Sequence, residues 1–129
     1  MRLPRLGKYA VVGTGNTVLS AALFAALHRQ GVSAVAAGAL AFAAGACNGY
    51  VWNRWWTFGA PDSRTARFRY LAVQAGGLAT TSAGIALLAP AFGAGAGYAA
   101  VLPSVTLGTY AINRTWTFKV QPWRQPAKR

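Results

Sequence analysis

Two copies of an Asn-Arg pair, each accompanied by tryptophan, are the residues of this chain best suited to binding chemistry. The segment Asn-Arg-Trp-Trp-Thr-Phe from Asn53 to Phe58 recurs 60 residues later as Asn-Arg-Thr-Trp-Thr-Phe from Asn113 to Phe118. A guanidinium binds two phosphate oxygens at once, and a neighbouring carboxamide supplies a further hydrogen-bond donor. The pairs therefore predict an anion site that takes Arg54 from the first copy and Arg114 from the second.

The same residue types also fit a purely structural role at the membrane interface, with no ligand bound. Arginine reaches toward water and tryptophan anchors helices wherever a helix leaves the hydrocarbon of a membrane. Trp56 and Trp116 considered alone fit this interpretation as well as they fit a binding site. The Asn-Arg pairing favours the binding site, in which tryptophan would contact a lipid chain or a sugar face.

Residues for enzymatic chemistry are few. The chain has one Asp, no Glu, one His and one Cys, so it has no carboxylate pair for acid-base catalysis and no metal-ligand cluster of recognisable spacing. It also has no glycine-rich phosphate loop ending in Gly-Lys-Ser or Gly-Lys-Thr. We predict no catalytic residue, no metal and no cofactor. Asp62 lies in a Pro-Asp-Ser-Arg loop, so no acid is available inside a membrane span to relay protons.

The elements that must position the two pairs follow from the distribution of charge. The 129 residues are 54% hydrophobic with a formal charge of +12, yet uncharged gaps of 20, 24 and 44 residues separate the cations. About 20 apolar residues suffice for one membrane crossing, so the last gap is long enough for two. We predict an all-α membrane protein with a single four-helix transmembrane domain over residues 1–129. The expected spans are Tyr9–Leu27, Val32–Asn53, Tyr70–Ala89 and Gly97–Asn113.

Orientation follows from the Lys and Arg residues between these spans. Twelve of the thirteen cations fall on one side, and Arg29 alone falls on the other. Because cytoplasmic loops carry the excess of Lys and Arg, both termini and the middle loop should be cytoplasmic. Anionic membrane lipids account for this charge with fewer assumptions than nucleic acid, which we do not expect as a partner.

The chain also repeats internally. Repeat 1 covers about residues 5–58, repeat 2 about 67–118, and residues 119–129 form a basic tail. Lys8-Tyr9 at the start of repeat 1 corresponds to Arg69-Tyr70 at the start of repeat 2. Both repeats begin and end on the same side, so they are predicted to be parallel two-helix repeats related by an axis along the membrane normal.

Polar and small residues inside the spans indicate how the helices pack. Asn16 and Asn48 are costly to expose to lipid and should face the bundle interior or a wet cleft. In repeat 2, Gly77 and Gly108 stand in their places. The second span carries small residues at four-residue steps: Ala37, Ala41, Gly45 and Gly49. This stripe suits close packing against the first span, the fourth span or a second subunit.

With these motifs in place, the chain resembles the GtrA-like family of small bacterial membrane proteins. The resemblance covers about Arg5 to Phe118 and includes the opening Lys-Tyr-Ala-Val-Val-Gly-Thr-Gly-Asn-Thr from Lys8 to Thr17. It implies a multi-pass protein of the bacterial inner membrane that moves a polyprenyl-phosphate-linked sugar outward for cell-surface polysaccharide assembly. Carried over by position, it points to Asn16 and to both motifs: Asn53, Arg54, Trp56, Thr57 and Phe58, then Asn113, Arg114, Trp116, Thr117 and Phe118.

Together these features predict substrate-binding residues Asn53, Arg54, Trp56, Asn113, Arg114, Trp116, Asn16 and Asn48. The predicted function is facilitated flipping of the lipid-linked monosaccharide, with direction set by synthesis inside and consumption outside. The alternative is a non-transporting scaffold that recruits or stabilises a membrane glycosyltransferase. Four short helices are few to surround a long lipid headgroup, so we expect a homo-oligomer. The identity of the sugar, and the choice between outward sugar lipid and returning bare polyprenyl phosphate, are left open by the sequence.

Overall fold

The computed structural model describes residues 3–119, apart from the side chains of Val35 and Ala94, and this part of the chain is helical with no strand. Its four long helices are α1 (Arg5–Arg29), α2 (Ala34–Trp52), α3 (Arg64–Phe92) and α4 (Ala94–Ile112). Short π-helical segments, η1 (Asn53–Phe58) and η2 (Asn113–Thr117), continue α2 and α4. The all-helical prediction is confirmed, whereas residues 120–129 of the predicted basic tail lie outside the described residues.

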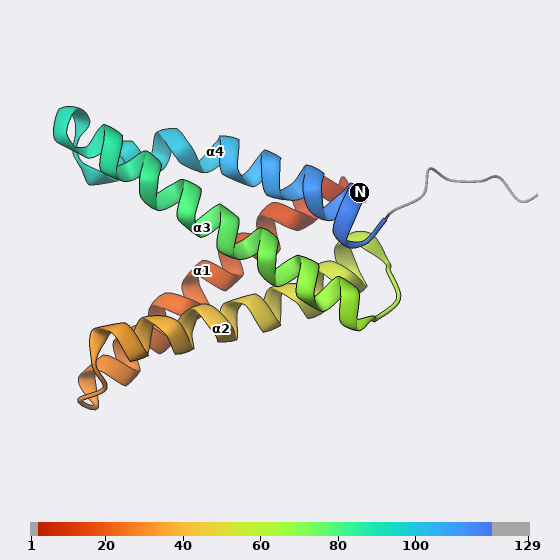
Figure 1. The fold of residues 1–129 in the computed structure, drawn as a ribbon, viewed down its shortest axis with the longest axis horizontal. Helices are drawn as coiled ribbons and strands as arrows, with labels where there is room; N and C mark the ends of the chain where they lie inside the picture. The colour runs from red at the N-terminus through yellow and green to blue at the C-terminus, as the bar shows by residue number, and fades with distance from the viewer. Residues whose placement is uncertain (1–2, 120–129) are drawn as a thin grey trace, which may run out of the picture.

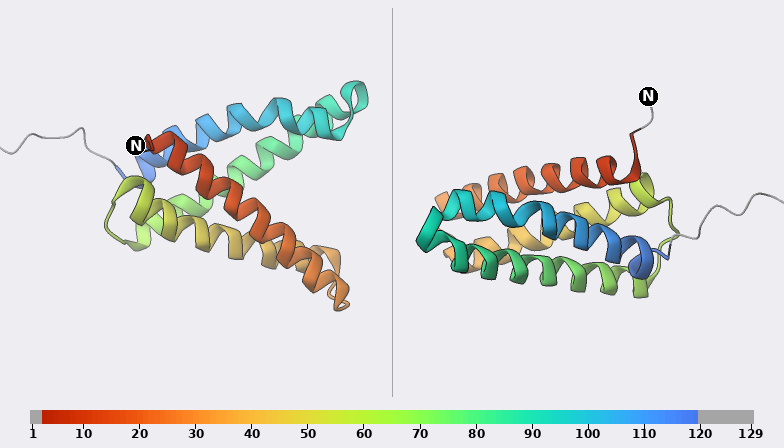
Figure 2. Two further views of the ribbon diagram at one scale, coloured as in Figure 1. Left: turned by 180° about the vertical axis from the view of Figure 1, so that it is seen from behind. Right: turned by 90° about the horizontal axis from the view of Figure 1, so that it is seen from above.

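The helices form two antiparallel hairpins, α1 with α2 and α3 with α4 (Figure 1). Each hairpin turns at a glycine with positive φ, Gly31 at 89° and Gly93 at 84°, a conformation that residues with a Cβ rarely adopt. The hairpins converge at the end that carries η1 and η2 and separate toward their turns. Figure 2 shows that α1 also begins at this converging end, which we call the junction end.

Three helices begin earlier than the apolar pattern predicted, and α4 starts at Ala94 instead of Gly97. α1 starts at Arg5 instead of Tyr9, and α3 starts at Arg64 instead of Tyr70. The Ser63 hydroxyl caps α3 by accepting a hydrogen bond from the Ala66 amide at 3.0 Å. Hydropathy marks where apolar residues begin, but a capped helix continues through the polar residues that precede them.

The small-residue stripe of α2 packs within its own hairpin. Its members are all buried: Ala37, Ala41, Gly45 and Gly49. The Ser20 hydroxyl of α1 donates a hydrogen bond to the Ala41 carbonyl at 3.0 Å. A Cβ added at Gly49 would collide with the Asn16 amide of α1 and the Tyr70 hydroxyl of α3. Of the alternatives left open by the sequence, the structure favours α1 as the main partner of the stripe.

The outer surface suits an apolar medium. α1 and α3 are long and apolar enough to cross a membrane, with mean hydropathies of 1.6 and 1.4 in their most apolar windows. Large apolar side chains point outward, including Val18 at 65% and Leu87 at 80% exposure. Such a surface is costly in water and favourable in lipid.

Replacing Gly49 with Leu tests the close packing of α2. The new side chain would displace Asn16 and Tyr70, so we expect a loss of about 1–3 kcal/mol and a lower Tm for the detergent-solubilised protein. Gly38→Leu is the control, because a Cβ at Gly38 in the same helix meets no atom within 4 Å. Equal Tm values for the two variants would contradict the packing described here.

Candidate functional site

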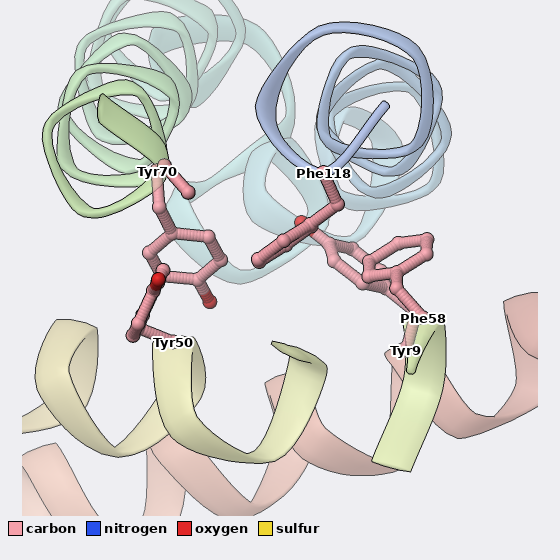
Figure 3. Packing of buried hydrophobic residues seen from close by; sticks show 6 residues of the cluster. Tyr9, Tyr50, Phe58, Tyr70 and Phe118 are labelled. Carbon is pink, nitrogen blue, oxygen red and sulfur yellow. The ribbon is translucent and has the colours of Figure 1, made fainter. Parts of the chain in front are cut away.

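The two hairpins meet in an aromatic cluster at the junction end (Figure 3). Phe58 and Phe118, which end the two repeated motifs, stack with centroids 5.0 Å apart and rings inclined by 27°. Tyr9 of α1 packs against Phe58 at 6.1 Å, and Tyr70 of α3 packs against Phe118 at 6.0 Å. Corresponding residues of the two motifs therefore make corresponding contacts at the junction end.

Tyrosines of α2 and α4 carry the cluster across the hairpin boundary. Tyr50 of α2 meets Tyr70 of α3 at 5.6 Å, and Tyr110 of α4 meets Tyr9 of α1 at 5.5 Å. Edge-to-face pairs at these separations add to the free energy gained from burial alone. The junction is therefore a packed aromatic centre shared equally by both hairpins.

Buried asparagines connect the hairpins by hydrogen bonds. Asn53 is 2% exposed and its amide donates to the Tyr70 hydroxyl at 3.0 Å. Asn113 is fully buried and its amide donates to the Tyr9 hydroxyl, also at 3.0 Å. Each bond runs from one hairpin to the other. In this arrangement both carboxamides are buried and engaged in bonds that hold the two hairpins together.

Threonines of the same motifs donate hydrogen bonds to the side-chain oxygens of the two asparagines. The Thr57 hydroxyl donates to the Asn53 side-chain oxygen at 2.9 Å, and the Thr117 hydroxyl donates to that of Asn113 at 2.8 Å. The backbone there is π-helical, as in the bond from the Phe118 amide to the Asn113 carbonyl at 2.9 Å. π-helical turns occur frequently at functional sites. An Asn and a Thr four residues apart therefore satisfy each other's buried side-chain groups.

A cation lies over the last tryptophan of each motif. The Lys8 ammonium is 5.3 Å from the Trp56 ring centroid and donates to the Trp56 carbonyl at 3.2 Å. The Arg69 guanidinium is 5.0 Å from the Trp116 ring centroid and donates to the Trp116 carbonyl at 2.9 Å. Both distances suit cation-π attraction. Each motif thus presents a basic side chain supported by an aromatic face.

The motif arginines lie at the same end, with unequal exposure. Arg54 is half-buried and its guanidinium donates to the Ala60 carbonyl at 3.4 Å, whereas Arg114 is exposed. Trp56 is also half-buried and Trp116 exposed. The structure therefore brings six of the predicted site residues to one end, the two motif asparagines included, and the half formed by the second motif is the more accessible.

The remaining predicted residues lie deeper, within the first hairpin. The Asn48 amide of α2 donates to the Asn16 side-chain oxygen of α1 at 2.7 Å, and both residues are half-buried. The Asn16 amide also lies beside Gly49, as does the Tyr70 hydroxyl. This Asn-Asn bridge therefore extends polar groups from the junction toward the middle of the helices.

Carboxylate charge near the junction is already neutralised. Among residues 3–119 the one ion pair joins Arg67 to Asp62, and Tyr50 donates a further hydrogen bond to Asp62 at 2.7 Å. These bonds from Arg67 and Tyr50 hold the pKa of the Asp62 carboxyl well below its ordinary value of 3.8. Within the described residues, the cations near Trp56 and Trp116 thus have no carboxylate to neutralise them.

Sequence reasoning singled out the motifs but missed their basic partners. The sequence predicts that Lys8 and Arg69 occupy corresponding positions, but it does not predict that they belong to the site. The available signal was that both repeats begin with a cation followed directly by tyrosine. Their contact with tryptophans about 47 residues away along the chain depends on how each hairpin folds.

Comparison with known proteins places these features in context. A family model described as "GtrA/DPMS, transmembrane domain" matches residues 8–118. The uncharacterized membrane protein YngA of Bacillus subtilis is 35% identical over 81 residues. The alignment covers 60% of this chain and 55% of the relative, so the chain spans about half the length of that relative. No solved structure matches the chain significantly.

Replacing Tyr70 with Phe tests the bonds between the hairpins. The ring remains but the Asn53 amide loses its buried partner, so we expect a cost of about 1 kcal/mol and a lower Tm. Tyr9→Phe should behave alike, because it removes the matching bond to Asn113. Tyr98→Phe, at an exposed tyrosine of α4, is the control. Unchanged Tm in both junction variants would show that these bonds do not hold the hairpins together.

Asp62→Asn tests the bonds by which Asp62 joins Tyr50 of α2 to Arg67 of α3. Because the folded-state pKa is depressed, the stabilisation is complete above the unfolded pKa of about 3.9 and is lost as pH falls through the folded value. We expect a Tm lower than wild type by a constant amount between about pH 5 and 7, with the gap closing below about pH 3.9. Arg67→Ala should lower the Tm by a similar amount at pH 7. Additive Tm losses in the double variant would show that Asp62 and Arg67 do not act through the bond between them.

Proposed function

This chain belongs to the GtrA/DPMS transmembrane domain family, and from that premise we propose that it moves a polyprenyl-phosphate-linked monosaccharide across the bacterial cytoplasmic membrane. The family connects the chain to lipid-linked sugar translocation in general. In this proposal the movement is facilitated flipping toward the outer leaflet, where the sugar glycosylates cell-surface polysaccharide.

The topology we propose has four spans, two parallel repeats and both termini in the cytoplasm. Supporting it, the junction end holds the start of α1, the connection between α2 and α3, and both motifs. The turn between α1 and α2 follows Arg29, and no Lys or Arg lies in or next to the turn between α3 and α4. Cations gather on the cytoplasmic side of membrane proteins, so the junction end is the cytoplasmic end in this proposal.

The observation that carries the proposal is the pair of cation-tryptophan contacts at the junction end. Lys8 over Trp56 and Arg69 over Trp116 lie in the same region as Arg54 and Arg114. Positive side chains without carboxylate partners suit a phosphodiester, and the aromatic faces beside them suit a lipid chain or a sugar. In this mechanism the junction end captures the phosphate at the inner leaflet.

Passage of the sugar needs polar groups beyond the capture site. The Asn16-Asn48 bridge provides carboxamides at half-buried positions in the first hairpin, directly beyond the junction. Amides without a fixed charge exchange hydrogen bonds with sugar hydroxyls without trapping the phosphate. Assembly of several copies would enclose this path, and net direction would follow synthesis inside and consumption outside.

Double replacement of the motif arginines tests transport. Arg54→Ala with Arg114→Ala should reduce flipping of a fluorescent polyprenyl-phosphate sugar in proteoliposomes by about tenfold or more, because charged hydrogen bonds contribute about 1.5–3 kcal/mol each. Arg29→Ala with Arg64→Ala removes the same charge at two exposed arginines outside the motifs and should flip as wild type does. Normal flipping by the well-inserted motif variant would refute the assigned roles.

The same reconstitution separates transport from the scaffold alternative. Flipping by the purified chain alone supports the proposal. A chain that inserts correctly but supports glycosylation only together with a membrane glycosyltransferase, with no flipping of its own, would favour the scaffold.

A further inference from the structure

A groove of about 480 Å³ runs along the second hairpin, outside the junction cluster. It extends from Trp116 at the junction end to Thr80 of α3 and Val101 of α4. Its volume lies within the roughly 300–1,000 Å³ of ordinary ligand pockets. A site of this size accepts a segment of a larger ligand.

The groove is apolar although two threonines and Ser104 line it. The Thr80 hydroxyl donates to the Gly76 carbonyl at 2.9 Å, and the Thr109 hydroxyl donates to the Val105 carbonyl at 2.8 Å. Both hydroxyls are thus satisfied by their own helix. The groove consequently offers few polar groups to a ligand and favours a hydrocarbon.

Glycines create the space. A Cβ placed at Gly76 or at Gly108 would meet no atom within 4 Å, so these positions open directly into the groove. Gly77 and Gly108 hold the places that Asn16 and Asn48 hold in repeat 1. The first hairpin therefore has a hydrogen-bonded polar bridge where the second hairpin has an open apolar groove.

The junction end of the groove is positively charged. Trp116 lines the groove, and the Arg69 guanidinium lies 5.0 Å from the centroid of its ring. An apolar groove that ends at a cation matches an amphiphile with an anionic head and a hydrocarbon chain. Charge complementarity thus fixes the direction in which such a ligand would lie.

We infer that this groove holds the isoprenoid chain of a polyprenyl phosphate, with the phosphate beside Arg69 at the junction end. The inference rests on the proposed function and assigns the lipid part of its substrate. An isoprenoid carries a methyl branch on every unit and is wider than a straight acyl chain, and the missing side chains at Gly76 and Gly108 widen this groove. The unlike hairpins then divide the amphiphile, the polar bridge serving the sugar and the groove serving the chain.

Binding to the purified full-length chain in detergent tests the inference. The probe is farnesyl monophosphate, compared with hexadecyl monophosphate, which has the same head and a straight chain. Gly76→Phe fills the groove and should weaken farnesyl phosphate binding by about tenfold, as expected when two methylene groups lose their apolar contacts. Gly108→Leu, which also projects into open space, is a second variant in case the first fails to fold.

The matched control is Gly15→Phe. Gly15 holds in repeat 1 the place of Gly76, and a Cβ there also meets no atom within 4 Å. This variant should bind farnesyl phosphate as wild type does. Equal affinities of wild type and both groove variants would overturn the inference, and hexadecyl phosphate binding as tightly as farnesyl phosphate would overturn the assignment to an isoprenoid.

The flipping assay separates this inference from the proposed function. Groove-dependent binding by a wild-type chain that does not flip its sugar lipid would reject transport and support the groove. Flipping by wild type without groove-dependent binding would reject the groove alone.

Discussion

Everything at the junction end depends on buried carboxamides that bond across the boundary between the hairpins. Asn53 reaches Tyr70, and Asn113 reaches Tyr9, each at 3.0 Å. In lipid the hydrophobic effect does not drive helices together, so packing and hydrogen bonds must hold the hairpins in register. Leaving such an amide unpaired in an apolar interior is costly, and this cost disfavours arrangements in which the hairpins separate at this end.

That constraint also positions the charged groups. Each tyrosine that accepts an asparagine bond follows directly after the cation that lies over a tryptophan, Lys8 before Tyr9 and Arg69 before Tyr70. Holding the tyrosine in the cluster therefore fixes the turn of helix that carries the cation. One hydrogen bond thereby serves two purposes, joining the hairpins and orienting a basic side chain at the surface.

The hairpins share their junction but differ beyond it. In the first, Asn16 and Asn48 bond to each other, whereas glycines at the matching positions of the second leave a groove. A molecule with a polar and an apolar part needs two different surroundings, and the two unlike hairpins provide them on one scaffold. This difference favours an amphiphile over a ligand with a uniform surface.

Charge gaps and repetition are local properties of the chain, so the helical class, the four helices and the two motifs could be predicted from the sequence. It placed Arg54, Arg114, Trp56 and Trp116 correctly at one end. It did not distinguish the structural role of Asn53 and Asn113 from ligand binding, since burial depends on which surfaces meet. Contacts between distant segments are set by packing, so the positions of Lys8 and Arg69 at the site became visible only in the folded chain. The same holds for the groove lined by Gly76, Gly77 and Gly108.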